Sequence, residues 1–149
     1  MRMNRGQGTT EYLIILAIVI VIALVVVGVL GGFPGIGQNI NEGQSKAYWG
    51  AAQPLALIDW RVAQSGSGSL VFQNQTANTI TLNSVVWDGN TVSVGQSLGP
   101  GGKYTVTSTS IRCITAGQSY GSSLSYNYNT PNLSDIDFNG TTSVAGNCQ

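Results

Sequence analysis

The sequence predicts an α+β protein in which a long, hydrophobic N-terminal α-helix is followed by an antiparallel, immunoglobulin-like β-sandwich. Two observations predict this class. The first is an uncharged apolar run over Tyr12–Leu30, and the second is a change, from about Leu55 onward, to short runs in which apolar and polar residues alternate. A long continuous apolar run is typical of a membrane-spanning helix. Alternation with a period of two is typical of half-buried strands.

The apolar run has the length of a membrane span. A helix over Tyr12–Leu30 would extend about 28 Å, close to the roughly 30 Å hydrocarbon core of a bilayer. It is apolar on all sides, which is not the pattern of a surface helix in a soluble domain. A secretory signal peptide is the alternative, but its apolar region is usually about 7–15 residues long. Only Gly31 and Gly32 would offer small residues at its cleavage site.

A glycine- and proline-rich segment follows the run. Gly31–Gly37 contains four glycines and one proline, which favour a break in the helix. Gln38–Ala52 is predicted to resume as a short helix because it contains good helix formers such as Ala47 and Ala51. Pro54 is predicted to end it.

The rest of the chain is predicted to form about seven or eight short strands, as expected for an antiparallel sandwich. Asp88-Gly89 predicts a tight hairpin turn between two strands, and Gly99–Gly102 predicts another reversal. The apolar positions that alternate with polar ones are Ile58, Trp60 and Val62; Ile80 and Leu82; Tyr104 and Val106; and Leu124, Tyr126 and Tyr128.

The composition argues against most enzymes and against nucleic-acid binding. Only 8% of the residues are charged, and six basic side chains balance six acidic ones. No basic patch for nucleic acid is therefore expected. The chain has no histidine, which removes the commonest general base and metal ligand. The two cysteines are too few for a zinc site without histidine, so we expect no catalysis and no cofactor.

The N-terminal motif is the most informative part of the sequence. Arg2 and Arg5 precede the apolar run, so the positive-inside rule places the N-terminus in the cytoplasm and the β domain outside. The segment Arg5–Leu13, RGQGTTEYL, resembles the leader of archaeal type IV pilins that carry class III signal peptides. That family has a basic residue, then Gly-Gln, a short spacer, and Glu-Tyr or Glu-Phe at the start of the hydrophobic helix. Thr10 departs from the family, in which small apolar residues are common at this position.

The resemblance implies how the chain is processed and what it contacts. A prepilin peptidase would cut between Gly6 and Gln7, before the hydrophobic helix. The chain would then divide into a cleaved leader (1–6), the hydrophobic helix with its Gly/Pro-rich connection (7–52), and an extracellular β-sandwich (53–149). Implied partners are the membrane before assembly, the pilus assembly machinery, and identical subunits in a helical filament.

Glu11 and Tyr12 are the residues expected to act in assembly. A buried, unpaired carboxylate at Glu11 would be costly in a filament core. Cleavage before Gln7 would create an α-amino group with a pKa near 8, and the amine of a neighbouring subunit would pair with Glu11. The alternative is that Glu11 is only a favourable acidic residue in the first helical turn.

Three further patterns concern covalent modification and metal binding. Cys113 and Cys148 are expected to form a disulfide in an oxidising exterior, with two buried thiols as the alternative. Asn74, Asn132 and Asn139 each begin an N-glycosylation pattern. Asp135–Gly140 matches the first six positions of an EF-hand loop, but Gly146 stands where the loop needs Glu. A solvated strand edge is therefore favoured over a calcium site.

The functional prediction is a structural subunit, a pilin, of an archaeal type IV adhesion pilus on the cell surface. The tyrosines and tryptophans are expected in the core and in subunit contacts rather than on an adhesive surface. One alternative is a minor pilin-like subunit of a related surface assembly. Another is a monomeric, membrane-anchored β-domain binding protein. A hydrolase is the remotest alternative, since Asp135 and Asp137 are the only close acidic pair.

Overall fold

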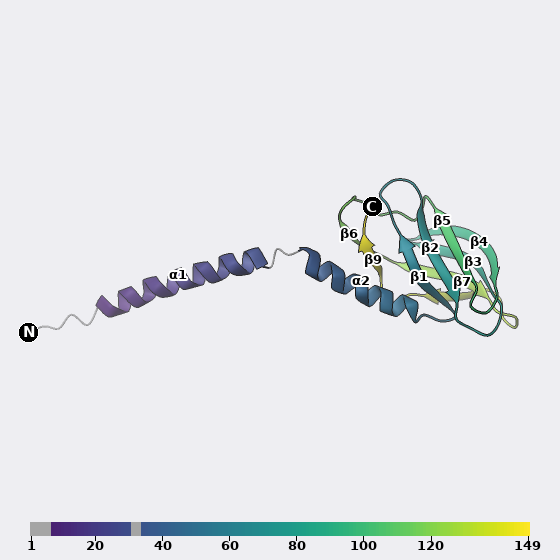
Figure 1. The fold of residues 1–149 in the computed structure, drawn as a ribbon, viewed down its shortest axis with the longest axis horizontal. Helices are drawn as coiled ribbons and strands as arrows, with labels where there is room; N and C mark the ends of the chain where they lie inside the picture. The colour runs from purple at the N-terminus through teal and green to yellow at the C-terminus, as the bar shows by residue number, and fades with distance from the viewer. Residues whose placement is uncertain (1–6, 31–33) are drawn as a thin grey trace, which may run out of the picture. The chain divides into compact units, whose positions relative to one another are not determined.

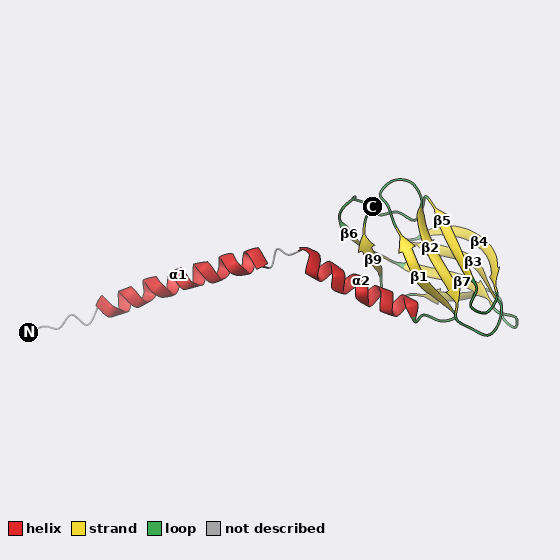
Figure 2. Ribbon diagram, in the orientation of Figure 1, coloured by secondary structure: helices red, strands yellow, loops and turns green. Residues whose placement is uncertain are grey.

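The protein consists of two compact units, residues up to Gly37 and Gln38–Gln149. The structure is a computed structural model and describes residues 7–30 and 34–149. Figures 1 and 2 show its helices and the strands of its C-terminal unit. The elements are α1 (Gln7–Leu30), α2 (Pro34–Gly50), β1 (Leu55–Arg61), β2 (Gly68–Asn74), β3 (Ile80–Trp87), β4 (Asn90–Leu98), β5 (Lys103–Ser108), β6 (Ser119–Ser122), β7 (Leu124–Asn129), β8 (Ile136–Asn139) and β9 (Val144–Asn147).

α1 is the predicted hydrophobic helix, and it begins at Gln7, ahead of the apolar run. The predicted break over Gly31–Gly37 is only partly correct. Its first three residues lie outside the described part of the chain, but Pro34 opens α2, so the segment from Pro34 to Gly37 is helical. Proline is tolerated at the first helical position because its missing N–H would have no intrahelical partner there.

The β domain is the predicted sandwich of antiparallel sheets. One sheet has the strand order β1-β2-β5, and the other has the order β4-β3-β7-β8. A two-stranded sheet of β6 and β9 is added to these. The described residues therefore contain nine strands rather than the seven or eight predicted. The short strands of the two-stranded sheet have too little alternation to be read from sequence.

β-Bulges change which face of a strand the side chains occupy. In β3, Ile80 and Leu82 are buried, but the register shifts between Leu82 and Ser84, and Val85 and Trp87 are the next buried residues. A bulge inserts one extra residue, so it reverses the alternation beyond it. A register shift in β1 between Leu57 and Asp59 has the same effect.

The two predicted reversals are present and differ in kind. Asp88 and Gly89 join β3 to β4 as a hairpin, and both have a positive φ, 45° and 81°. This is the requirement of a type I′ turn. Gly99–Gly102 leads from β4 into β5, so it carries the chain from one sheet to the other.

Aromatic residues join the two larger sheets in the core. Phe72 of β2 meets Tyr126 of β7 edge to face, with ring centroids 5.7 Å apart. Tyr126 also stacks on Phe138 of β8 at 4.7 Å. Its hydroxyl donates a hydrogen bond of 3.0 Å to the carbonyl oxygen of Leu55 in β1. Tyr126 therefore spans the sandwich and keeps its polar atom paired, as a buried tyrosine requires.

The part of α2 from Gln38 onward belongs to the β unit. Trp49 is fully buried, and its indole N–H donates to the carbonyl oxygen of Thr142 at 3.1 Å. The buried Ser45 hydroxyl donates to the carbonyl oxygen of Ser143 at 2.9 Å and accepts from the amide of Ala145 at 3.0 Å. The sequence predicts that residues 38–52 group with the hydrophobic helix, whereas these contacts join them to the sandwich.

The expected disulfide links Cys113 to Cys148, whose Cα atoms are 5.8 Å apart. The amide of Cys113 donates to the carbonyl of Ala63, and the amide of Gln149 donates to the carbonyl of Val62. These hydrogen bonds hold the loop before β6 and the C-terminal residues, which the bridge joins, against the same short segment after β1. The chain-entropy model gives a loop of this size about 3–4 kcal/mol of stabilisation.

Candidate assembly helix and surface sites

α1 presents an apolar surface in all directions. Each side chain that the structure describes in it, from Gly8 to Val26, is exposed. The large apolar side chains from Tyr12 to Val26 are 41–66% exposed. The segment Gly8–Val26 has a mean hydropathy of 2.7 over 19 residues and is long and apolar enough to cross a membrane. Exposing so much apolar surface to water is unfavourable, so lipid or other protein is expected to cover this helix.

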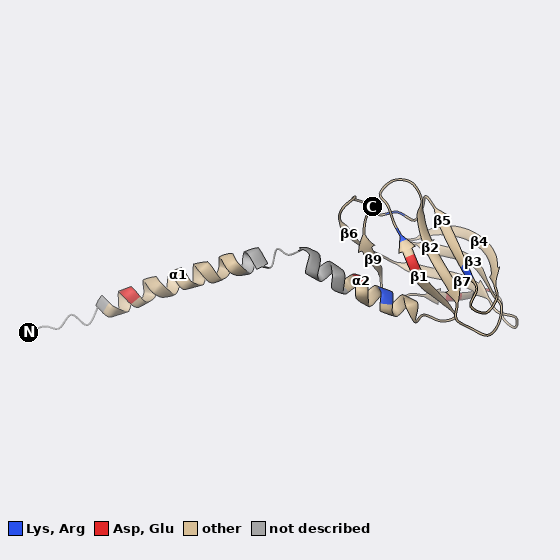
Figure 3. Ribbon diagram, viewed as in Figure 1, with Lys and Arg blue, Asp and Glu red and all other residues tan. Residues whose placement is uncertain are grey.

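Glu11 is the only charged residue in the sequence of α1, one turn after its first residue. Figure 3 shows it as the single red band on the described part of this helix. Its side chain and that of Tyr12 are exposed. Gly6 lies outside the described residues, and Gln7 opens α1. Glu11 and Tyr12 therefore lie on the exposed surface of α1, just after its first turn.

Asn74 is buried, and this corrects its interpretation as a glycan acceptor. Its side chain is 1% exposed. Its amide nitrogen donates to the carbonyl oxygens of Asn78 (2.7 Å), Leu98 (2.9 Å) and Gly99 (3.2 Å). Its amide oxygen accepts from the backbone N–H of Thr76 at 2.9 Å. Asn74 holds together the loop after β2 and the reversal after β4, so its nitrogen is not accessible to a glycan in the folded domain.

The other two glycosylation patterns are on the surface. Asn132 is exposed in the loop between β7 and β8, beside Leu133, which is 65% exposed. Asn139 is exposed at the end of β8, an edge strand of the four-stranded sheet. Both side chains remain glycan acceptor candidates on steric grounds.

The carboxylates of Asp135 and Asp137 take part in a row of side-chain hydrogen bonds rather than in a cluster of metal ligands. Asp135 and Asp137 each accept a hydrogen bond from the side-chain amide of Asn127, at 2.9 and 2.8 Å. Asn83, the residue at the bulge of β3, donates in turn to the amide oxygen of Asn127 at 2.7 Å. Across residues 7–30 and 34–149, no group of three or more His, Cys, Asp or Glu side chains is placed to hold a metal ion.

Most of the large aromatic residues are structural. Trp49, Trp87 and Tyr126 are at most 1% exposed and form part of the core. Burial raises the pKa of the Tyr126 and Tyr120 hydroxyls above their usual value. Tyr120, on β6, packs near Trp87 with ring centroids 6.3 Å apart and also lines a surface groove.

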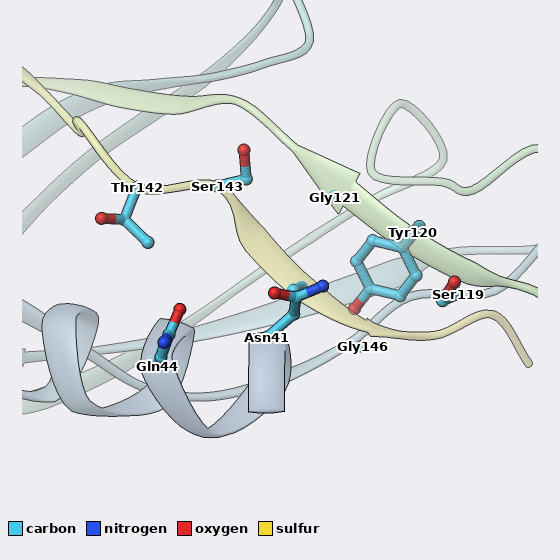
Figure 4. A pocket seen from close by; sticks show the side chains of 9 residues that line it. Asn41, Gln44, Ser119, Tyr120, Gly121, Thr142, Ser143 and Gly146 are labelled. Atoms are coloured by element: carbon cyan, nitrogen blue, oxygen red, sulfur yellow. The ribbon is translucent and has the colours of Figure 1, made fainter. Parts of the chain in front are cut away.

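The groove lies between α2 and the β6–β9 sheet, and Figure 4 shows its lining. Its residues come from three separate parts of the chain: Asn41 and Gln44 on α2, the β6 segment around Tyr120, and the segment from Thr142 into β9. The groove is not evident from the sequence, because no local motif marks it and only the docking of α2 brings these segments together. No protein-family model matches this chain, and no curated protein matches it.

Proposed function

We propose that this chain is a structural subunit, a pilin, of an archaeal type IV adhesion pilus and polymerises through α1. The observation that carries the proposal is the exposed apolar surface on every side of α1. In a filament, the helices of neighbouring subunits would cover this surface on several sides. The arrangement of an apolar helix followed by a sandwich is that of a pilin-like protein.

The proposal assigns a role to each part of the chain. A prepilin peptidase removes the leader at Gly6, and the new amine of Gln7 pairs with Glu11 of a neighbouring subunit. The precursor is held in the cytoplasmic membrane by α1, and the mature subunit is at the cell surface. The β domain faces the environment, which agrees with its disulfide, since disulfides persist in oxidising compartments. Its work is mechanical and adhesive, without catalysis.

A membrane-anchored monomer is the second candidate. The 19-residue segment Gly8–Val26 also suits a single membrane span. A minor subunit of a related assembly would share the processing and helix packing of a pilin but would be scarce in the filament. Processing at Gly6 and recovery in filaments separate a pilin from an anchored monomer.

Mass spectrometry of the cell-surface protein, combined with electron microscopy of sheared surface material, tests the proposal. We expect a mature N-terminus at Gln7 and filaments in which this chain is the main component. A chain that keeps Met1–Gly6, or begins after Gly31 or Gly32, and is absent from filaments would contradict the proposal. A processed chain that is only a trace component would support the minor-subunit alternative.

A further inference from the structure

We propose that the groove between α2 and the β6–β9 sheet binds a neutral saccharide. Its volume is about 440 Å³, within the roughly 300–1,000 Å³ of typical small-molecule sites. All of its described lining belongs to the unit Gln38–Gln149. The inference therefore concerns the β domain alone and holds whether or not the chain polymerises.

The lining offers neutral hydrogen-bonding groups. Asn41 and Gln44 supply amides, and Ser119, Thr142 and Ser143 supply hydroxyls. Within the described part of the chain, none of these five side chains is engaged in a hydrogen bond, so their donors and acceptors are available to another molecule. Amides and hydroxyls both donate and accept, which matches the hydroxyl groups of a sugar.

The remaining lining excludes other classes of small molecule. No charged side chain is among the described residues that line this groove, so a charged compound would lose its hydration without finding a counter-charge there. A purely apolar compound would leave the amides and hydroxyls without partners. Among the described lining residues, Tyr120 supplies the aromatic ring, which can cover the apolar face of a sugar while the tyrosine hydroxyl stays able to hydrogen-bond.

The walls of the groove are held in place before anything binds. The Ser45 hydroxyl bonds the backbone of Ser143 and Ala145, and the indole N–H of Trp60 donates to the carbonyl oxygen of Ala145 at 3.1 Å. Tyr120 is paired with Gly146 across the β6–β9 sheet, and a Cβ at Gly146 would lie 2.9 Å from the Tyr120 hydroxyl oxygen. Glycine thus lets the ring lie against β9, as Figure 4 shows. A fixed site lowers the entropic cost of binding.

The test uses the full chain in lauryldimethylamine oxide micelles, because sugar-based detergents would compete for the groove. The probes are the methyl glycosides of glucose, galactose, mannose and N-acetylglucosamine, measured by saturation-transfer NMR and by amide shifts in the protein. We expect at least one glycoside to receive saturation at its ring protons. Its addition should shift the amide signals of Tyr120, Gly121 and Gly146.

Two variants locate the binding. A Cβ at Gly121 would have only the Cβ of Ser143 nearby, at an ordinary 3.6 Å, so Gly121→Leu should fill the groove without disturbing the fold. We expect it to weaken binding by at least about tenfold, and Gln44→Ala to weaken it by about threefold to tenfold. Gln75→Ala is the matched control, since Gln75 is an exposed glutamine outside the groove whose side chain makes no hydrogen bond among the described residues.

The binding measurements on the parent chain and its variants can support or overturn the saccharide site. If no glycoside binds the parent chain, or if Gly121→Leu binds as well as the parent, the proposal is wrong. If Gly121→Leu does not give the parent near-UV spectrum, the comparison of Gln44→Ala with Gln75→Ala decides: equal affinities overturn the proposal. Each of these results leaves the processing and filament tests of the proposed function unaffected.

Discussion

At the scale of single residues, substitution of Glu11 is expected to affect the proposed filament assembly most strongly. Glu11 is the only charge in the sequence of α1, so Glu11→Ala should leave membrane insertion intact. It should also leave most of the cleavage at Gly6, because the peptidase is expected to read mainly the residues that flank the bond. Incorporation into filaments should be lost, because a buried charge without its partner costs about 3–5 kcal/mol.

The measurement compares processed Glu11→Ala subunit in membranes with subunit in sheared filaments. Glu11→Asp should be intermediate, because it keeps the charge and loses reach. Thr9→Ala, a nearby exposed position on the same helix, is the control. If Glu11→Ala assembles as well as the parent when it is the only pilin present, Glu11 is merely a favourable residue at a helix start.

Asn74 and Asn132 begin the same kind of glycosylation pattern but should respond differently to substitution. Asn74→Ala removes a donor shared by three carbonyl groups, of which those of Asn78 and Gly99 also accept from the Thr76 hydroxyl and the Gly102 amide. A buried polar group left without a partner costs about 1–3 kcal/mol. We therefore expect a loss of about 1–3 kcal/mol in the free energy of unfolding. Asn132→Ala, on the exposed loop, should change it by less than about 0.5 kcal/mol. Urea unfolding of both variants is the measurement, and equal stabilities would contradict the structural role of Asn74.

At the scale of elements, glycines test the docking of α2 on the sandwich. A Cβ at Gly140 would overlap the Trp49 ring and lie 2.8 Å from the carbonyl oxygen of Leu124. Gly140→Ala should therefore destabilise the domain by about 1–3 kcal/mol or more. Gly43, on the exposed side of α2, has nothing within 4 Å of such a Cβ, so Gly43→Ala should stabilise the helix by up to about 1 kcal/mol. Thermal unfolding should show opposite shifts, and shifts of the same sign would argue against the docking.

The docking of α2 on the sandwich also determines which fragment of the chain should fold as an isolated β domain. A fragment Gln38–Gln149 keeps Ser45, Tyr48 and Trp49 against the sandwich and should fold as a soluble monomer. A fragment Gln53–Gln149 lacks Trp49, whose removal alone should cost about 3–5 kcal/mol. Size-exclusion chromatography and near-UV circular dichroism distinguish the two. If the shorter fragment is as stable as the longer one, α2 contributes little to the core; if the longer one polymerises, the assembly interface includes the β domain.

At the scale of the whole molecule, buried tyrosines predict instability in alkali. Burial raises the pKa of Tyr126 and Tyr120 in the folded chain, while in the unfolded chain both titrate near 10. Above about pH 10 the unfolded state therefore binds fewer protons than the folded state, and stability falls as the pH rises. Below this pH the contribution is fully present.

Tyr126→Phe tests this pH dependence. At neutral pH it should cost about 1 kcal/mol, because the hydrogen bond to the carbonyl oxygen of Leu55 is lost. Above about pH 10, the free energy of unfolding of this variant should also decrease less steeply with pH than that of the parent. Urea unfolding at a series of pH values gives both quantities. A variant with the same alkaline slope as the parent would show that Tyr126 is not a source of the effect.

Local patterns in the sequence were sufficient for the element types and for several of their boundaries. The apolar run predicts α1, the alternating runs predict strands, and Asp88-Gly89 predicts the hairpin, because each depends on neighbouring residues. The even pair of cysteines in a chain without histidine favours the disulfide. The bulges at Asn83 and Ile58 were not predictable, because register depends on how partner strands pack rather than on one strand alone.

By itself the sequence determined a hydrophobic helix with one early carboxylate, a sandwich of short strands and a disulfide. Only the tertiary structure decided that α2 is part of the sandwich, that Asn74 is a buried structural residue, and that a neutral groove lies beside Tyr120. The physical reason is the same in each case. Secondary structure and chain reversals follow from local periodicity, whereas burial and cavities depend on contacts such as that between Ser45 and Ala145, which are far apart in the chain.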